Sequence, residues 1–273
     1  NHHVSVSGSS DKVRWSASYG RMDEDAVMIN SSFVRNNFSF RSWYNPVKNL
    51  SINVQLRYSS TDVNGAGANS INDKGNNAGT GRLINALRYS PMAMNYLQDV
   101  EDYDIYTEEF GANPLREVID NDNRRHREQW NASANVTWTI IPNLRLKIEG
   151  GIDNSSETND RYYGLSSYYT RQKANVQNHP NTDSKTQYAR TFRNSNTLSY
   201  NFNKVIKDSR HKLDMLIGQE FSYRKGNTES VVAEGFPEFY DMEMCLNYRG
   251  SASLISAADN SFAENEVMLS FFG

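Results

Sequence analysis

Residues 130–153 read WNASANVTWTIIPNLRLKIEGGID, and apolar and polar side chains alternate along most of this segment. The alternation runs unbroken from Trp130 to Ile140 and returns from Leu144 to Ile152, with Pro142-Asn143 as turn residues between the two arms. Successive side chains of a strand point to opposite faces of a sheet. The segment therefore predicts a long antiparallel hairpin with one apolar face and one polar face.

The apolar face of this hairpin fits two environments. In a soluble sandwich it packs on a second sheet, and strands usually run about five or six residues. In an outer-membrane barrel it faces lipid, and a tilted strand needs roughly 9–11 residues to cross. Each arm spans about eleven residues, which favours the membrane. Trp130 and Trp138 near the two ends of the first arm favour it as well.

The composition agrees with a β-barrel. The 273 residues have a hydrophobic fraction of 37% and a mean hydropathy of -0.74. No run approaches the roughly 18 apolar residues of a membrane helix, whereas barrel strands place apolar side chains only at alternate positions. The net charge of -3 is small and negative, so it gives no indication of nucleic-acid binding. The single cysteine, Cys245, excludes an intrachain disulfide.

Alternating segments recur along the chain and are joined by connections of two lengths. Short connections are predicted at residues 10–12, 45–49, 141–143 and 204–211, and long ones at 23–33, 60–128, 156–185 and 225–263. Short helices are expected inside the long connection at residues 60–128, over residues 82–89 and 113–119. The two classes alternate strictly, so they fall on opposite ends of one sheet, as do the periplasmic turns and external loops of an outer-membrane barrel.

The predicted fold class is therefore all-β. We expect a section of an antiparallel transmembrane β-barrel with long extracellular loops that contain short helices. Val267, Leu269 and Phe271 still alternate when the chain reaches Gly273, and the first turn is of the short class. Both observations lead us to expect further strands before Asn1 and after Gly273.

Short motifs follow one another along nearly the whole chain. They are HVSVSG (residues 3–8), RWSASYG (14–20), NALRYSPM (85–92), NPL (113–115), HKL (211–213), IGQE (217–220) and LSFFG (269–273). In this order they resemble the SusC/RagA family of TonB-dependent outer-membrane importers of Bacteroidota.

The resemblance implies a large plugged barrel, of which residues 1–273 form the N-terminal half of the barrel domain, without the plug domain and the C-terminal strands. It also implies import of oligosaccharides, a SusD-like surface lipoprotein as lid, and TonB as the partner reached through the plug. Peptide import by the same family is the alternative cargo. A passive porin and a soluble glycan-binding β-sandwich are the alternative functions.

We predict no enzyme, no cofactor and no metal site. The histidines, His2, His3, His126, His179 and His211, lack metal-ligand spacing, and Cys245 has no activating neighbour in the sequence. Residues 75–81 are rich in Gly but lack the Lys-Ser/Thr of a phosphate loop. The acidic residues 99–109 and the triplet Asp23-Glu24-Asp25 are interpreted as solvated loops.

The candidate substrate-binding residues are Tyr162, Tyr163, Tyr168 and Tyr169, in the predicted loop at residues 156–185. Aromatic faces pack on sugar rings and on protein surfaces alike, so interfacial packing is the alternative role. Charged residues at the polar positions of the strands are predicted to face the barrel lumen, in contact with plug and water rather than with substrate. These residues are Arg57, Arg145, Lys147, Glu149 and Asp153.

Overall fold

The computed structural model describes residues 1–65, 87, 118–165, 167, 170, 176, 178–202, 213–258 and 265–273. Their strands are β1 (His2–Ser9), β2 (Val13–Asp25), β3 (Ser32–Val47), β4 (Leu50–Asn64), β5 (Asn121–Ile141), β6 (Leu144–Tyr163), β7 (Asn181–Asn201), β8 (Asp214–Glu234), β9 (Leu254–Ala258) and β10 (Glu266–Phe272). The helix α5 (Met242–Asn247) and the 3-10 turn η2 (Arg249–Ser251) lie between β8 and β9. No helix within these ranges has the length and apolar character to cross a membrane.

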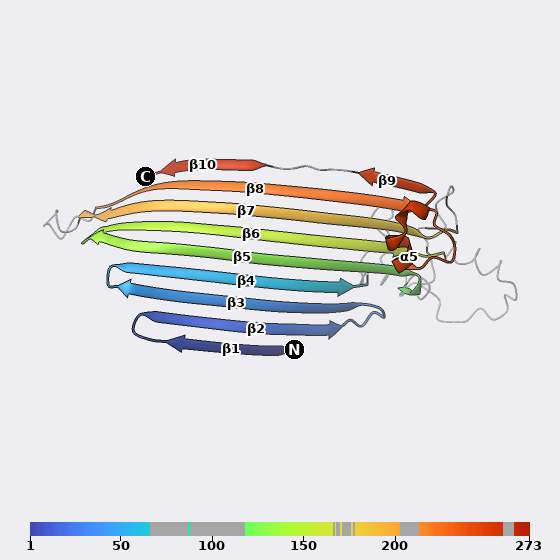
Figure 1. Ribbon diagram of the computed structural model, residues 1–273, viewed down its shortest axis with the longest axis horizontal. Helices are drawn as coiled ribbons and strands as arrows, with labels where there is room; N and C mark the ends of the chain where they lie inside the picture. Colours follow the sequence, from blue (N-terminus) through green and yellow to red (C-terminus); the bar gives the residue numbers. More distant parts are fainter. Residues whose placement is uncertain are drawn as a thin grey trace.

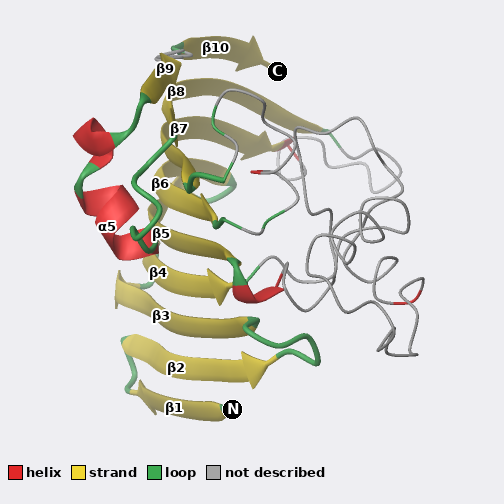
Figure 2. Ribbon diagram, turned by 90° about the vertical axis from the view of Figure 1, so that its right-hand side faces the viewer, coloured by secondary structure: helices red, strands yellow, loops and turns green. Residues whose placement is uncertain are grey.

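The described strands form one 10-stranded antiparallel sheet (Figure 1). From β1 to β8 each strand pairs with the next along the chain, and β9 and β10 both pair with β8. The sheet curves, and β1 and β10 lie at opposite open edges (Figure 2). The all-β antiparallel fold class is confirmed, as an open section of a barrel wall.

The pairing register sorts the side chains into two unlike faces. One line of paired residues crosses nine strands and holds only apolar side chains: Val6, Ala17, Phe40, Leu56, Ala132, Ile152, Phe192, Tyr223 and Val267. The neighbouring line, one residue along each strand, holds only polar ones: Ser5, Ser18, Ser39, Arg57, Asn131, Asp153, Thr191, Arg224 and Glu266. A shift of one residue in any strand would exchange the faces, so the sequence specifies the register strongly.

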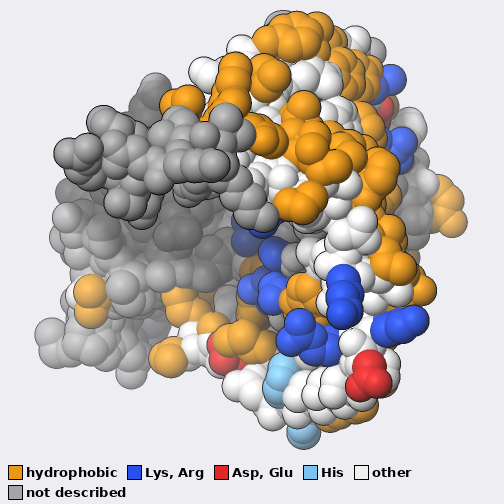
Figure 3. Space-filling view, turned by 90° about the vertical axis from the view of Figure 1, so that its left-hand side faces the viewer, with side chains coloured by type: hydrophobic (Ala, Val, Ile, Leu, Met, Phe, Trp, Pro, Cys, Tyr) orange, Lys and Arg blue, Asp and Glu red, His pale blue; other side chains and the backbone are white. Residues whose placement is uncertain are grey.

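The apolar face is the convex one, and it is exposed. Ile148 and Phe192 are each 43% exposed and Leu269 is 58% exposed, and Figure 3 shows apolar side chains along the outer curve of the sheet. A soluble sandwich would bury this face against a second sheet. The described residues form one sheet only. An apolar band across a whole sheet marks a surface that contacts lipid or protein.

Three amide side chains interrupt the apolar face on β7 and β8. Asn196 Nδ2 donates to Asn194 Oδ1 at 2.7 Å and to Gln219 Oε1 at 3.0 Å, and Asn194 Nδ2 donates to the backbone oxygen of Glu149 at 2.9 Å. The register places Asn194 opposite Phe221 and Asn196 opposite Gln219, on the face that carries Leu198. Because the amides hydrogen-bond mainly to one another, their polar groups are largely satisfied where water would be excluded.

The strands are longer than the alternating pattern predicted. β5, β7 and β8 hold 21 residues each and β6 holds 20. Residues 23–25, 60–64, 121–128, 156–163, 181–185 and 225–234 were predicted as loop and are strand. In most of these segments both faces are polar, so the hydropathy alternation is lost while the backbone ladder continues. The loop boundaries and the acidic triplet's place in a loop were therefore wrong.

The tight turns lie at one end of the sheet, which we call the turn end, and the long connections leave from the opposite, loop end (Figure 1). The turns at residues 10–12 and 142–143 are confirmed. The turn predicted at 45–49 is shorter, because β3 continues through a bulge between Tyr44 and Val47.

The predicted connection at 204–211 and helix at 82–89 lie outside the described residues, apart from Leu87. Of the helix at 113–119, residues 118 and 119 are described and helical.

Candidate ligand-binding groove and cap

The concave face is hollowed into a groove of about 730 Å³ that extends from β3 to β8. Its concave-side lining residues are Arg35, Asn37, Ser39, Arg57, Ser59, Gln129, Asn131, Asp153, Ser155, Ala189, Thr191, Arg193 and Arg224. The polar line of paired residues runs through it from Ser39 to Arg224. The alternating pattern of the strands thus delivers hydrogen-bonding and charged groups to one hollow surface.

The groove has an excess of positive charge. Four arginines and one aspartate line it. Asp153 accepts hydrogen bonds from Asn131 and from Arg193, so its carboxylate is already engaged. Guanidinium groups bind carboxylates and sulfates with two parallel hydrogen bonds. The remaining arginines give the groove the chemistry of an anion-binding surface.

The charged residues that were predicted to face the lumen lie on the concave face of the sheet. Arg57 and Asp153 lie on the same line of paired residues, within the groove. Arg145, Lys147 and Glu149 follow on the same face of β6 toward the turn end, where Lys147 Nζ lies 2.7 Å from Glu149 Oε1. Sequence reasoning missed Arg35, Arg193 and Arg224. The relation of Arg193 and Arg224 to Arg57 depends on pairing between strands that are distant in sequence, whereas Arg35 lies on β3, which a tight turn joins to the strand of Arg57.

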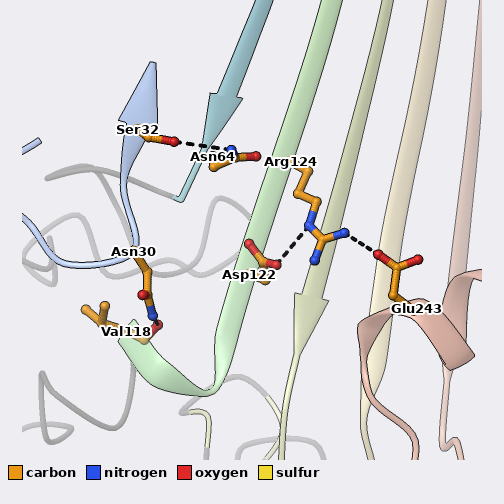
Figure 4. A network of polar contacts seen from close by, with 7 residues as sticks. All are labelled: Asn30, Ser32, Asn64, Val118, Asp122, Arg124 and Glu243. Carbon is orange, nitrogen blue, oxygen red and sulfur yellow. Dashed lines mark hydrogen bonds and ion pairs between the residues drawn. The ribbon is translucent and has the colours of Figure 1, made fainter. Parts of the chain in front are cut away.

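A second hollow, of about 990 Å³, lies at the loop end. It is lined by Asp25, Ala26, Met28, Ile29, Asn30, Ser31, Ser32, Asn64, Ile119, Asn121, Asp122 and Arg124. Polar contacts join the segments around it (Figure 4). Asn30 Nδ2 donates to the backbone oxygen of Val118 at 3.4 Å, and Asn64 Nδ2 donates to Ser32 Oγ at 3.2 Å.

Arg124 ties this hollow to the helix α5. Its Nε donates to Asp122 Oδ2 at 3.0 Å and its Nη1 donates to Glu243 Oε1 (Figure 4). The hydrogen bond to Glu243 is the main cause that raises the pKa of Arg124 above its usual value. One permanently charged side chain thus bridges the start of β5 and a helix that follows β8.

The segment after β8 forms a cap on the convex side of the sheet at the loop end (Figure 2). Ala233, Phe236 and Cys245 are completely buried and form its core. Gly235 permits the turn into the cap with φ 76°, a conformation that side chains rarely allow. Its backbone N–H donates to Asn181 Oδ1 at 3.0 Å, which joins the cap to β7. Asp241 caps α5 by accepting from the backbone N–H of Met244 at 2.8 Å.

Two of the candidate tyrosines, Tyr162 and Tyr163, lie on opposite faces of the sheet. Tyr162 lies on the convex side, packs against the cap core and donates its hydroxyl to the backbone oxygen of Tyr240 at 3.0 Å. Burial raises the pKa of Tyr162 above its ordinary value, so the hydroxyl stays a donor. The adjacent Tyr163 points to the other face and is buried, 6% exposed. Tyr168 and Tyr169 lie outside the described residues. The assignment of these four residues to substrate binding stays a prediction.

Cys245 has the environment of a packing residue. Its side chain is completely buried, and burial raises the pKa of the thiol to about 12. The thiolate, which is the reactive form, is therefore scarce at neutral pH. Among the described residues no group of three or more His, Cys, Asp and Glu side chains is placed to hold a metal ion.

His126 lies on the convex side of β5, beyond the apolar band, and its contact with Asp62 can be tested by titration. Its Nδ1 lies 2.5 Å from Asp62 Oδ1, and this hydrogen bond raises the pKa of His126 above 6.5. The contact therefore stabilises the fold fully below the unfolded-state pKa, about 6.5, and loses its effect as the pH rises through the folded-state pKa.

We expect Asp62→Asn to lower the pKa of His126 toward its ordinary value, as measured by NMR titration of the imidazole. Asp153→Asn, which removes a carboxylate from the concave face, is the matched control and should leave that pKa unchanged. Equal titration of His126 in all three proteins would contradict the contact.

Comparison with known proteins gives a similarity of fold. No protein-family model matches the sequence, and no curated protein matches it. The structure is similar to chains of the RagAB peptide importer in the closed-closed and open-open states, and to a chain of a further structure described as the RagAB peptide transporter. In all three cases the TM-score is 0.68, the sequence identity is 19% and the match covers 98% of this chain.

This chain spans 29% of the first of those chains and 28% of the other two. At 19% identity, the similarity establishes the fold. The chain therefore has the fold of less than a third of a RagAB importer chain, in agreement with the SusC/RagA resemblance of its sequence.

Proposed function

We propose that this chain forms a section of the barrel wall of a TonB-dependent nutrient importer in the outer membrane. The observation that carries the proposal is the apolar line from Val6 to Val267, which crosses nine strands beside a line of polar side chains. A wall with lipid outside and a wet lumen inside requires this division of faces. The convex face contacts lipid, and the concave face lines the lumen.

The turn end lies at the periplasm and the loop end lies outside the cell. Short turns on one side and long connections on the other are the ordinary arrangement of outer-membrane barrels. β5 to β8 extend beyond the membrane on the external side, where they carry the cap. Trp138 and Trp130 lie eight positions apart along β5 and mark the two lipid–water interfaces.

The proposed cargo is an oligosaccharide, as the SusC/RagA resemblance implies. A SusD-like lipoprotein acts as the external lid, and TonB acts through a plug domain in the lumen. The residues Tyr162, Tyr163, Tyr168 and Tyr169 remain the proposed aromatic contacts to cargo or lid. Peptide cargo is the second candidate, and the fold similarity to a peptide importer favours it. The chain supplies wall and loops, and it performs no bond chemistry.

The experiment is a growth and uptake comparison in the source organism. The gene is deleted, and the strain is given either an oligosaccharide mixture or a peptide digest as its limiting nutrient. We expect loss of uptake for one of the two classes and its recovery when the full-length gene is restored. Uptake should also stop when TonB is removed or when the proton-motive force is dissipated.

Uptake that persists without TonB and without the proton-motive force would identify a passive porin and overturn the proposal. Recovery of the protein in the aqueous phase after detergent phase separation would instead support the soluble glycan-binding sandwich. Fractionation of the full-length protein with the outer membrane is the accompanying expectation.

A further inference from the structure

The charge of the groove is not balanced by its own acidic side chains. Asp153 is shared between Asn131 and Arg193. Arg35 Nε donates to two neutral groups, Asn37 Oδ1 at 2.9 Å and Ser59 Oγ at 3.4 Å. Neither contact offsets the charge of Arg35, so the guanidinium remains available to an anion.

Arg57 and Arg224, which lie on the polar line inside the groove, also lack a close carboxylate among the described residues. The guanidinium of Arg57 lies against the side-chain amide of Gln55. Arg224 Nη1 has only a long contact of 3.9 Å with Glu266 Oε2, and both side chains are more than half exposed. Ion pairs of this length and exposure contribute little. By contrast, Lys147 is matched by Glu149 at 2.7 Å on the same face of the sheet.

The sheet also sets the distance between Arg57 and Arg224. Arg57 on β4 and Arg224 on β8 belong to one line of paired residues, with Asn131, Asp153 and Thr191 between them. Four strand spacings of about 4.8 Å separate the two arginines by about 19 Å along the sheet. An extended peptide covers this distance in about six residues. A single small anion cannot reach both arginines.

Apart from Asp153 and Arg193, which pair with each other, the floor between Arg57 and Arg224 is neutral and polar. Gln129, Asn131, Ser155 and Thr191 line it. Amide and hydroxyl groups both donate and accept hydrogen bonds, so they suit the backbone of a peptide or the hydroxyls of a sugar equally. The floor therefore holds an extended chain, while the flanking arginines select its charge.

We propose that this groove binds an oligomeric cargo through carboxylate groups held by Arg57 and Arg224, four strands apart. The inference rests on the proposed import function, because it places the groove in the lumen. It adds a substrate class to that function: extended oligomers with repeated carboxylates, of about six units when the chain is a peptide.

The test uses the full-length protein purified from outer membranes, with hexaglutamate and a galacturonate hexamer as probes. Hexaglutamine and a neutral galactose hexamer are their uncharged counterparts, and diglutamate tests the spacing. We expect one of the two acidic hexamers to bind at least tenfold more tightly than its neutral counterpart and more tightly than diglutamate. The acidic hexamer that binds identifies whether the carboxylates belong to a peptide or to a sugar. Binding should weaken as sodium chloride is raised, because exposed charges are screened.

The variant Arg57→Gln/Arg224→Gln should lose about tenfold or more in affinity for the acidic hexamer. Arg145→Gln removes one positive charge from the same face outside the groove, and it should bind like the unchanged protein. Equal binding of acidic and neutral hexamers would overturn the inference. So would unchanged affinity in the double variant, or a loss of thermal stability in that variant without a loss of affinity, since the groove would then be filled by the protein itself.

The two levels of the proposal fail separately. Energised uptake with no dependence on cargo charge would leave the import function intact and reject the groove. Absence of energised uptake would reject the import function whatever the acidic hexamers do in solution.

Discussion

Replacing Ala134 by arginine is expected to lower the stability of the full-length protein in a lipid bilayer by about 2–4 kcal/mol, the cost of a charge facing lipid near the midplane. Ala134 lies midway between Trp130 and Trp138 on the convex face, in line with Val54 and Gly150. The measurement is reversible unfolding in urea from lipid vesicles, compared with the unchanged protein.

The matched control is Ser133→Arg, one residue away on the same strand. Ser133 lies on the concave face opposite Gln55 and Gly151, where water or a polar partner can solvate a guanidinium. We expect this variant to lose less than about 1 kcal/mol, as lumen substitutions do. Equal losses for the two variants would show that the faces do not differ in environment.

Replacing Phe236 by alanine is expected to destabilise the cap by about 3–5 kcal/mol, because it empties a completely buried site. Phe236 packs with Ala233 and Cys245, and its backbone N–H donates to the oxygen of Pro180 at 3.1 Å. The cap should open locally while the sheet persists. Hydrogen exchange of residues 235–258 measures the change.

The control for this prediction is Phe239→Ala, in the same segment. Phe239 is 78% exposed, so its removal should alter exchange in the cap by less than about 0.5 kcal/mol. Similar exchange in the Phe236 and Phe239 variants would contradict the assignment of Phe236 as the anchor of the cap.

The sequence predicted the fold wherever the two faces of a strand have different surroundings. From Trp130 to Ile152 one face is apolar and the other polar, so the polarity of each side chain indicates the face on which it lies. Beyond that band the strands continue with polar residues on both faces, as in residues 121–128 and 156–161. Backbone hydrogen bonding still holds those strands, and it leaves no trace in hydropathy.

The groove was predicted only in part. The alternation of β4 and β6 predicted the concave orientation of Arg57 and Asp153 correctly. The relation of Arg57 to Arg193 and Arg224 requires the register of four further strand pairs, and the connections between strands do not specify it in advance. The amide cluster of Asn194, Asn196 and Gln219 could not be predicted for the same reason. Its side chains lie close together only because β7 and β8 pair in this register.

The cap was predicted as a long loop, and its helix was not predicted at all. Gly235 and Pro237 are residue types typical of irregular structure, and six helical residues are too few to give a periodic pattern. Asp241 as an N-cap residue was the local signal for α5. The place of Tyr162 under the cap depends on that segment folding back over the convex face, which is a tertiary contact.

In the proposed function, lipid touches one face of these strands and water touches the other. Single cysteines at residues 131–137, introduced into a Cys245→Ala background, can be labelled with a fluorophore in native outer membranes and tested with lipid-soluble and water-soluble quenchers. Labels at Ala132, Ala134 and Val136 should be quenched from the lipid. Labels at Asn131, Ser133, Asn135 and Thr137 should be quenched from water or shielded from both. Absence of a two-residue period, or lipid quenching at the concave positions, would contradict a transmembrane barrel wall.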